Sequence, residues 1–204
     1  MPLPTAAKIR RLRRKDLPAD TVELAQYLIG KVLVHDTIDG PISGRIVETE
    51  AYPVGDSSGH AFRGQTQRNR SLYLARGHAY VYFIYGTSYM LNVSSESPEI
   101  GAGVLLRALE PLQGIALMAR GRGITRLTDL ARGPGRLAAA MRVDLRFDGT
   151  DLCGNEALWL GKSSKNPVTV GTTTRIGITR EIERPLRFFE QGSVYVSGPK
   201  RLLK

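Results

Sequence analysis

The strongest constraint on the fold of this chain is a series of short β-rich segments separated by tight-turn dipeptides. Residues 31–35 (KVLVH) and 42–52 (ISGRIVETEAY) flank Asp39-Gly40, a dipeptide typical of β-hairpins. Residues 79–85 and 88–93 repeat the pattern around Gly86-Thr87, and residues 103–108 (GVLLRA) indicate a further buried strand. Because strands joined by tight turns run antiparallel, the middle of the chain is expected to form an antiparallel sheet.

Helices are predicted at three places. Asp20 and Glu23 have the spacing of a capping box, and the helical repeat that follows is ended by Gly30. Residues 112–120 and 134–141 also have helical patterns, and the last third returns to short strands (ALWL, VTV, RIGI, RPLRFF and SVYVS). Strands and helices are mixed without a regular βαβ order, so we expect an α+β domain.

Charge narrows the class of partner. Lys and Arg total 29 against 19 acidic residues, for a net charge of +10, and 22 of the basic residues are Arg. Arg binds phosphates with two parallel hydrogen bonds and stacks on bases, which favours nucleic acid, although an Arg-rich genome explains the bias equally well. Six basic residues fall between Lys8 and Lys15. Residues 1–15 are therefore interpreted as a basic N-terminal arm that touches phosphates, with a merely solvated face as the alternative.

Other classes of protein are excluded or disfavoured. Cys153 is alone, which removes every intrachain disulfide. No apolar run approaches the roughly 20 residues of a membrane span, so we expect a soluble, intracellular protein with no membrane partner. His35, His60 and His78 lack metal-ligand spacing, so neither a metal nor another cofactor is expected.

Two charged residues interrupt apolar strands. In RIVETEAY, period-two alternation places Ile46, Glu48 and Glu50 on one face. Arg107 interrupts the apolar run VLLRALEP and needs a buried anion or phosphate. Glu50 and Arg107 together form a candidate site, with a structural ion pair as the alternative.

Tyrosines gather in the second predicted hairpin. Four of the eight lie between Tyr80 and Tyr89, and Tyr85 precedes Gly86 at the hairpin tip. In a basic protein, an aromatic side chain at a loop tip can wedge between stacked bases, and others can hold an extruded base. Ordinary β-propensity is the alternative, and we prefer it for Tyr80 and Tyr89.

An ordered set of motifs then identifies a family. GRIVETEAY (44–52), RNR (68–70), VYFIYG (81–86), LNVSS (91–95) and VLLRALEP (104–111) occur together, followed by ARGPGRL, EALWL, RPLRFF and GSVYVS. This set strongly resembles the alkyladenine, or 3-methyladenine, DNA glycosylase family, over nearly everything beyond the basic arm. The expected fold is then one α+β domain, residues 1–204, with a curved, mostly antiparallel sheet flanked by helices and a protruding β-hairpin.

The resemblance implies a function and a role for each matching residue. It implies a metal-free, monomeric base excision repair enzyme that flips alkylated or deaminated purines out of double-stranded DNA and hydrolyses the N-glycosidic bond. The implied substrates are 3-methyladenine, 7-methylguanine, hypoxanthine and ethenoadenine. Such an enzyme belongs with the cytoplasmic nucleoid of a bacterium or in a eukaryotic nucleus. By position, the matching residues are Glu50 as general base, Arg107 beside the attacking water, Tyr52, His60, Tyr82 and Asn92 in the base pocket, and Tyr85 as the residue that fills the vacated stack.

Arginines and lysines complete the hypothesis. Four arginines are assigned to the DNA backbone: Arg68, Arg70, Arg122 and Arg136. No lysine occurs between Lys31 and Lys162, so this segment offers no amine for a Schiff base, and lyase activity is disfavoured. Three alternatives stay open: a non-catalytic protein that binds duplex nucleic acid, a carbohydrate hydrolase with Glu48 and Glu50 as its acid pair, and a helix-hairpin-helix glycosylase suggested by GPGRLA.

Overall fold

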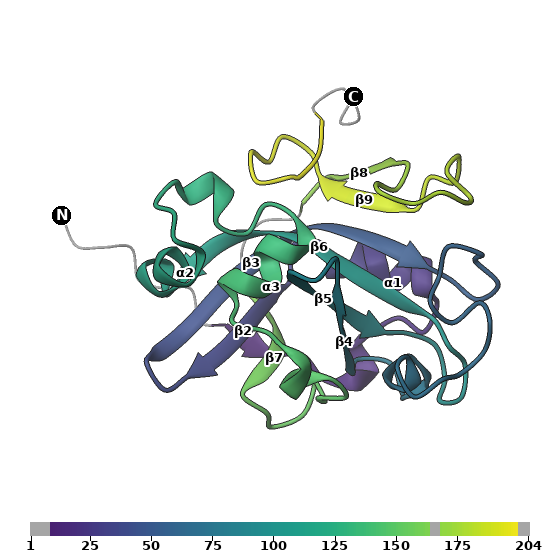
Figure 1. Cartoon of the computed structure of the whole chain (residues 1–204). Coiled ribbons are helices and arrows are strands. Elements are labelled where there is room, and N and C mark those ends of the chain that lie inside the picture. The colour runs from purple at the N-terminus through teal and green to yellow at the C-terminus, as the bar shows by residue number, and fades with distance from the viewer. Residues whose placement is uncertain (1–8, 164–167, 200–204) are drawn as a thin grey trace.

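The computed structural model describes residues 9–163 and 168–199. In these residues three α-helices and nine strands are found, and Figure 1 shows their arrangement. The helices are α1 (Thr21–Leu28), α2 (Ile115–Arg122) and α3 (Pro134–Ala140). The strands are β1 (Arg10–Arg11), β2 (Val32–Thr37), β3 (Gly40–Tyr52), β4 (Ala79–Ile84), β5 (Ser88–Ser94), β6 (Gly103–Gln113), β7 (Leu158–Lys162), β8 (Val170–Thr173) and β9 (Arg187–Glu190).

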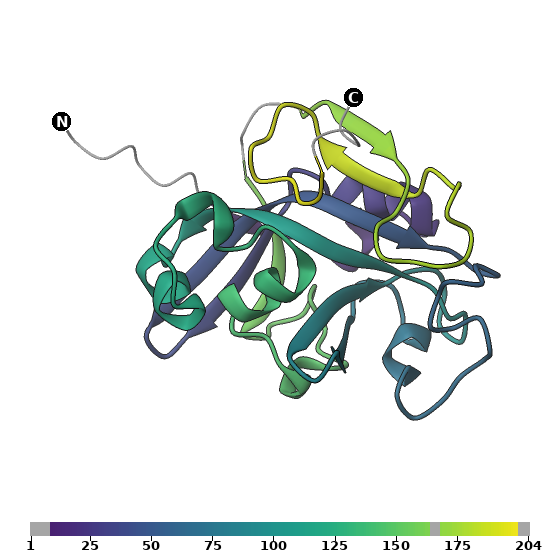
Figure 2. The same ribbon diagram turned by 45° about the horizontal axis from the view of Figure 1, so that its top comes forward.

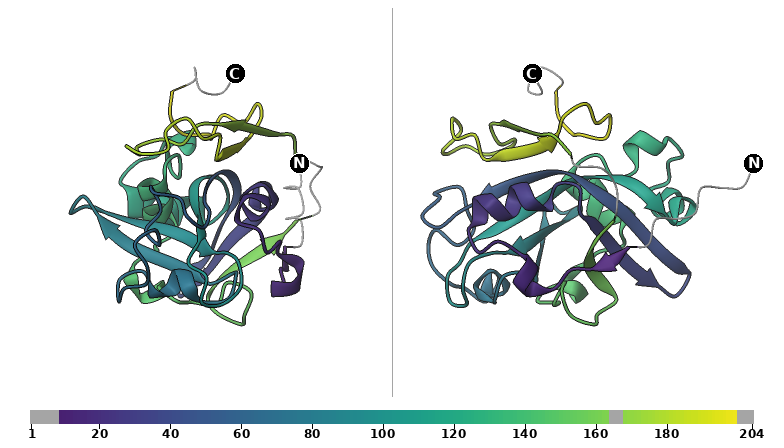
Figure 3. Two further views of the ribbon diagram at one scale, coloured as in Figure 1. Left: turned by 90° about the vertical axis from the view of Figure 1, so that its right-hand side faces the viewer. Right: turned by 180° about the vertical axis from the view of Figure 1, so that it is seen from behind.

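One antiparallel sheet organises the molecule. Its strand order is β1-β7-β2-β3-β6-β5-β4, and the β8–β9 hairpin joins it through β9, which pairs with the end of β3. Figure 2 shows the β8–β9 hairpin at the top of the molecule. The left view in Figure 3 shows the β4–β5 hairpin projecting from the body. The predicted α+β fold with an antiparallel sheet is confirmed.

Apolar side chains from both the sheet and the helices form the core. Asp20 caps α1 by accepting hydrogen bonds from the backbone N–H groups of Val22 and Glu23, 2.8 and 2.9 Å away, as the sequence predicts. Helix α1 packs on β3, and α3 packs on β5 and β6. The front and rear views in Figures 1 and 3 place α1 and α3 on opposite sides of the sheet. No helix in the described residues is long and apolar enough to cross a membrane.

Three predicted elements differ from the structure. The helix expected at 112–120 begins only at Ile115, because β6 continues to Gln113 and Gly114, with φ +68°, then turns the chain. RIGI (175–178) and SVYVS (193–197) are not strands. Gly177, with φ +78°, turns the first segment away from an extended path, and the second is irregular chain that packs on the sheet. Alternating apolar residues cannot distinguish such packed loops from strands.

The alternation expected along β3 is interrupted at Val47. Ile46 pairs with Leu109 of β6, and Glu48 pairs with the preceding residue, Ala108. This leaves Val47 as an extra residue, and an extra residue reverses the faces on which later side chains lie. Ile46 packs in the main core, whereas Val47 packs with Ala108 in a second, smaller cluster. The prediction that Ile46 shares a face with the two glutamates is therefore wrong.

Arg107 is the second extra residue. The partner of β3 advances from Ala108, opposite Glu48, to Leu106, opposite Thr49, so Arg107 has no direct partner. Leu106 lies in the main core, and Arg107 contacts the side chains of Glu48 and Glu50. The two irregularities bring three charged residues of adjacent strands to one place on the sheet.

The basic N-terminal segment is partly built into the fold. Residues 1–8 lie outside the described residues, and β1 pairs with β7 at the edge of the sheet. Leu12 is fully buried, and the guanidinium of Arg11 lies 4.2 Å from the centre of the Trp159 ring. Arg14 forms a 2.6 Å ion pair with Asp151. Arg11 and Arg14 are thus engaged by the protein itself and do not belong to an exposed arm.

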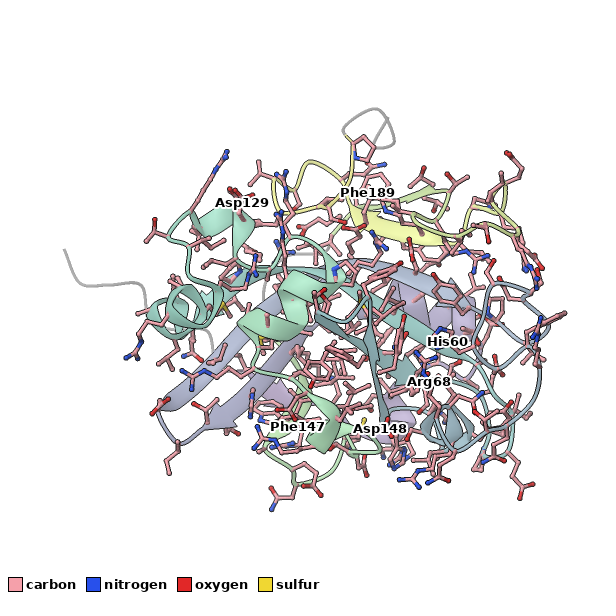
Figure 4. The ribbon with its side chains drawn as sticks, viewed as in Figure 1. His60, Arg68, Asp129, Phe147, Asp148 and Phe189 are labelled. Atoms are coloured by element: carbon pink, nitrogen blue, oxygen red, sulfur yellow. The ribbon has the colours of Figure 1, made fainter. Side chains whose placement is uncertain are left out.

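Asp148 ties the projecting hairpin to the body. Its Oδ1 accepts the backbone N–H of Val81 in β4 at 2.9 Å, and its Oδ2 accepts the hydroxyl of Ser71 at 2.8 Å. Figure 4 labels Asp148 below β4. We expect Asp148→Ala to lower the free energy of unfolding by about 1–3 kcal/mol, because both donors lose a charged acceptor. Urea denaturation measures this change.

The control is Glu183→Ala, an exposed residue, which should change the free energy of unfolding by less than about 0.5 kcal/mol. Equal stability of the two variants would contradict the role given to Asp148.

Candidate active site

Glu50 lies near the end of β3 with its side chain fully buried. Its Oε1 accepts the backbone N–H of Ile176 at 2.8 Å and lies 3.1 Å from Nη1 of Arg107. Its Oε2 accepts the hydroxyl of Tyr52 at 3.0 Å. The structure thus brings together Glu50 and Arg107, the two residues that the sequence predicts as a pair. A buried carboxylate with three such donors is held in one orientation.

Arg107 lies between two carboxylates. Its Nε donates to Oε1 of Glu48 at 2.8 Å, and Nη1 contacts Glu50. Its Nη2 donates to Oγ of Ser197 at 3.3 Å. Burial lowers the pKa of Arg107, but the charges of Glu50 and Glu48 outweigh that effect, so its pKa lies above the ordinary value. The guanidinium therefore stays charged.

Glu48 is the centre of a wider buried network. Besides Arg107, its Oε1 accepts Nε of Arg187 at 2.7 Å and the Ser197 hydroxyl at 3.0 Å, and its Oε2 accepts the Ser197 backbone N–H at 2.6 Å. The two carboxylates are balanced by two guanidinium groups, as buried charge requires. Both carboxylates bind Arg107 and Glu48 is saturated by donors, so the glutamates do not form the acid pair of a carbohydrate hydrolase.

A cleft of about 550 Å³ opens beside this network. Its lining includes all four predicted base-pocket residues together with Arg107 and Tyr85: Tyr52, His60, Tyr82, Asn92, Tyr85 and Arg107. Met90, Pro134 and the 176–180 segment complete its walls. Among residues 9–163 and 168–199, no three His, Cys, Asp or Glu side chains come together in a way that could hold a metal ion.

His60 and two tyrosines form one wall of the cleft. The His60 ring is tilted against the Tyr82 ring, with 4.4 Å between centres, and its Nδ1 lies 2.8 Å from the Tyr80 hydroxyl. Burial beside these rings, and secondly the charge of Arg68, lowers the pKa of His60 below its ordinary value. The imidazole is therefore neutral at pH 7. Burial raises the pKa of Tyr82 to about 12, so this phenol stays protonated.

Tyr52 also lines the cleft. The guanidinium of Arg175 lies 4.6 Å from the centre of its ring. Burial and the neighbouring charge of Glu50 raise the pKa of Tyr52 above its ordinary value, so its hydroxyl keeps the proton that it donates to Glu50. Asn92, on β5, donates from Nδ2 to the backbone oxygen of Tyr80 at 3.1 Å, which fixes its amide at the cleft.

Tyr85 stands at the tip of the β4–β5 hairpin and is 76% exposed. Both Tyr85 and Gly86 have positive φ, +56° and +67°, as in a type I′ turn. A bulky residue with positive φ is uncommon and is strained by roughly 1–3 kcal/mol. A large aromatic side chain left mostly exposed in a strained turn favours a role in binding over a role in folding.

The four predicted backbone-contacting arginines lie at two places. Arg68 stacks over Tyr82 with 5.5 Å to the ring centre, and Arg70 is exposed beside it in a shallow groove; Figure 4 shows Arg68 close to His60. Arg122 ends α2, and Arg136 is exposed on α3. Partial burial and the nearby charge of Arg136 lower the pKa of Arg122, so these two cations lie close together.

Sequence reasoning missed four residues that hold the site. Arg187, on β9, has the signal that identified Arg107, since it is an arginine in an apolar strand (RPLRFF). Arg175, Ile176 and Ser197 carry no comparable signal, because they act from irregular segments through buried hydrogen bonds.

Replacing one member of the buried network tests its contribution to stability. Glu48→Gln leaves Arg187 buried without a counter-ion, so we expect the free energy of unfolding to fall by about 3–5 kcal/mol, measured by urea denaturation. The double variant Glu48→Gln, Arg187→Met should recover most of this loss, because it removes both charges. Wild-type stability of the single variant would show that the pair is not a structural centre.

Comparison with known proteins identifies the family of this chain. The methylpurine-DNA glycosylase (MPG) family matches residues 15–194. A protein of Mesorhizobium japonicum is 62% identical over 191 residues, covering 94% of this chain and 92% of that protein. A protein of Paraburkholderia phytofirmans is 59% identical over 192 residues, covering 94% of this chain and 90% of that protein. Both carry the name "Putative 3-methyladenine DNA glycosylase". The chain therefore belongs to the methylpurine-DNA glycosylase family and is a hydrolase of N-glycosyl bonds.

Proposed function

We propose that this glycosylase flips alkylated or deaminated purines, the class of 3-methyladenine, 7-methylguanine, hypoxanthine and ethenoadenine, out of duplex DNA into the cleft. The observation that carries the proposal is the buried Glu50–Arg107 pair beside a cleft walled by Tyr52, His60 and Tyr82. Enzymes that act on a base must extrude it from the stack, at a cost of a few kcal/mol.

Aromatic walls offset much of that cost. Stacking of a base on an aromatic side chain contributes about 1–3 kcal/mol, so Tyr52 and Tyr82 can compensate for the lost stacking in DNA. A purine that carries positive charge after alkylation gains a further contribution from the tyrosine faces. His60 is neutral at pH 7 and so does not repel such a base. The fixed amide of Asn92 presents polar groups to the base edge and favours one pattern of exocyclic groups over another.

Hydrolysis follows from the position of Glu50. Its carboxylate accepts a proton from water, and the water oxygen bonds to the sugar C1′ as the C1′–N bond breaks. The electron pair of that bond leaves with the base, so a cationic alkylated base departs as a neutral molecule. A neutral base such as hypoxanthine departs as an anion, which takes up the one proton that Glu50 has accepted from water. Arg107, held by Glu48 and Ser197, orients Glu50 and adds positive charge beside the sugar and its phosphate.

The lining of the cleft also limits the chemistry. None of the cleft residues in the described part of the chain is a lysine, so the site offers no side-chain amine to the sugar aldehyde. We infer a monofunctional enzyme that releases the base without cutting the backbone. Arg68, Arg70, Arg122 and Arg136 hold the phosphates of the duplex, and Tyr85 fills the position that the flipped nucleotide leaves. The enzyme acts as a monomer on one lesion at a time.

Replacing the general base tests the mechanism. Glu50→Gln keeps the shape of the side chain but cannot take a proton, so base release should fall by at least about 100-fold. Purified protein is incubated in EDTA with duplex DNA that contains hypoxanthine, ethenoadenine or methylated purines, and free base and abasic sites are scored. Binding to duplex DNA should change little, as fluorescence anisotropy would show.

The matched control for Glu50→Gln is Glu183→Gln, which changes an exposed carboxylate and should leave base release at the wild-type rate. Substantial excision by Glu50→Gln would remove Glu50 from the reaction. Absence of base release by the wild-type protein from every lesion would overturn the proposed substrate class.

The hairpin tip offers a separate test of base flipping. Tyr85→Asn places a residue that tolerates positive φ in the turn, so stability should stay the same or rise by up to about 1 kcal/mol. Excision from a fully paired duplex should nevertheless fall, because nothing fills the vacated stack. Excision of the same lesion from single-stranded DNA, where there is no duplex stack to fill, should fall much less. An equal effect on both substrates would argue against the wedge.

A further inference from the structure

Besides Arg107, two groups donate hydrogen bonds to Glu50: the Tyr52 hydroxyl and the Ile176 backbone N–H. Arg175 lies outside the cleft but adjoins both groups. The side chain of Arg175 is fully buried and is absent from the cleft lining. Its guanidinium stacks on the Tyr52 ring at 4.6 Å, and Tyr52 donates to Oε2 of Glu50. The next residue, Ile176, donates its backbone N–H to Oε1 of Glu50 at 2.8 Å. Each oxygen of Glu50 is therefore bonded to a group that Arg175 contacts or directly precedes.

Three contacts fix the guanidinium itself. Its Nη1 donates to the backbone oxygen of Ala51 at 3.0 Å and lies 2.7 Å from Oδ2 of the fully buried Asp56. The third contact is the stack on Tyr52. Because Ala51 immediately precedes Tyr52, Arg175 holds this tyrosine through both its backbone and its ring. Only a planar guanidinium can stack on a ring and donate within its plane at the same time.

The hydrogen bonds of this arginine all come from one of its three nitrogens. Nη1 makes the contacts with Ala51 and Asp56, whereas Nε and Nη2 have no hydrogen-bond partner among the described residues. The geometry favours stacking on Tyr52 over complete hydrogen bonding.

We propose that Arg175 is a positioning residue for the reaction, which orients Tyr52 and the Ile176 amide so that both donate to Glu50. The proposal rests on the role of Glu50 as general base given above. Hydrogen bonds to a carboxylate favour its ionised form, and only the ionised form accepts a proton from water. Arg175 thereby supports a reactive group that it does not touch.

Several charged or titratable side chains face Glu50 from the elements around it. They are Tyr52 on its own strand, Arg107 of β6, Tyr82 of β4, and Glu48 and Arg187 through the network on β3 and β9. Substitution of Arg175 leaves all of these residues in the chain. A shift of the acid limb of the rate profile would therefore report the two lost or displaced hydrogen bonds.

The test measures the pH profile of single-turnover hypoxanthine excision by Arg175→Met. Loss of the two hydrogen bonds removes support for the ionised carboxylate, so the acid limb of the rate profile should move to higher pH by about one unit. At a pH on the wild-type acid limb, the rate should fall by about tenfold or more. Arg175→Lys keeps the charge beside Asp56 but not the planar stack, so it should also show the shifted limb.

Arg184→Met is the matched control. Arg184 binds the same Asp56, at 3.3 Å, and also Glu181, but its side chain is 43% exposed and does not stack on Tyr52. Its acid limb should coincide with that of the wild type. An Arg175→Met profile that coincides with both would overturn the proposal, whatever the absolute rates.

A second pair of variants covers poor folding of Arg175→Met. Asp56→Asn with Arg175→Met removes both buried charges, and Asp56→Asn alone keeps the stack on Tyr52. The double variant should show the shifted limb relative to Asp56→Asn, and identical limbs would refute the positioning role. Failure of the proposed function is distinguishable, because it would appear as excision by Glu50→Gln or as no excision by the wild type.

Discussion

The rest of the site depends on the ion pairs and hydrogen bonds of the buried Glu48 carboxylate. It binds Arg107 of β6, Arg187 of β9 and both polar groups of Ser197, so it joins two strands and the C-terminal segment to β3. A buried charge without partners is costly, which makes these contacts mutually dependent. The same charges hold Arg107 where it contacts Glu50. The carboxylate of Glu50, the proposed general base, is thus supported by this buried network of charges.

Most of the cleft walls around this centre come from loops and from the projecting β4–β5 hairpin. Tyr82 and Asn92 project from the β4–β5 hairpin, whereas His60 and the 176–180 segment belong to loops. Loops tolerate changes of sequence better than strands do. In the proposed mechanism, reaction chemistry and base selection therefore rest mainly on different kinds of structure: buried charge on paired strands for the first, and loop and hairpin surfaces for most of the second.

The sequence predicts the strands and the pairing of Glu50 with Arg107, because turn dipeptides and charges in apolar runs are local signals. It does not predict that the faces of β3 reverse at Val47, since an extra residue arises from pairing between strands and has no mark of its own. RIGI and SVYVS have the alternation of strands but pack as irregular chain. Arg175 and Ser197 could not be found from the sequence, because their roles depend on contacts with residues over a hundred positions away.

The way Asp148 binds β4 has a consequence for the behaviour of the protein in solution. β4 is the end strand of the sheet, and the end strand of a sheet can pair with a strand of another molecule. Here several of its outward groups are already occupied: the N–H of Ala79 by Thr150, the N–H of Val81 by Asp148, and the carbonyl of Phe83 by Arg68. The hairpin can therefore project from the body while offering fewer free backbone groups for pairing with another copy of the chain.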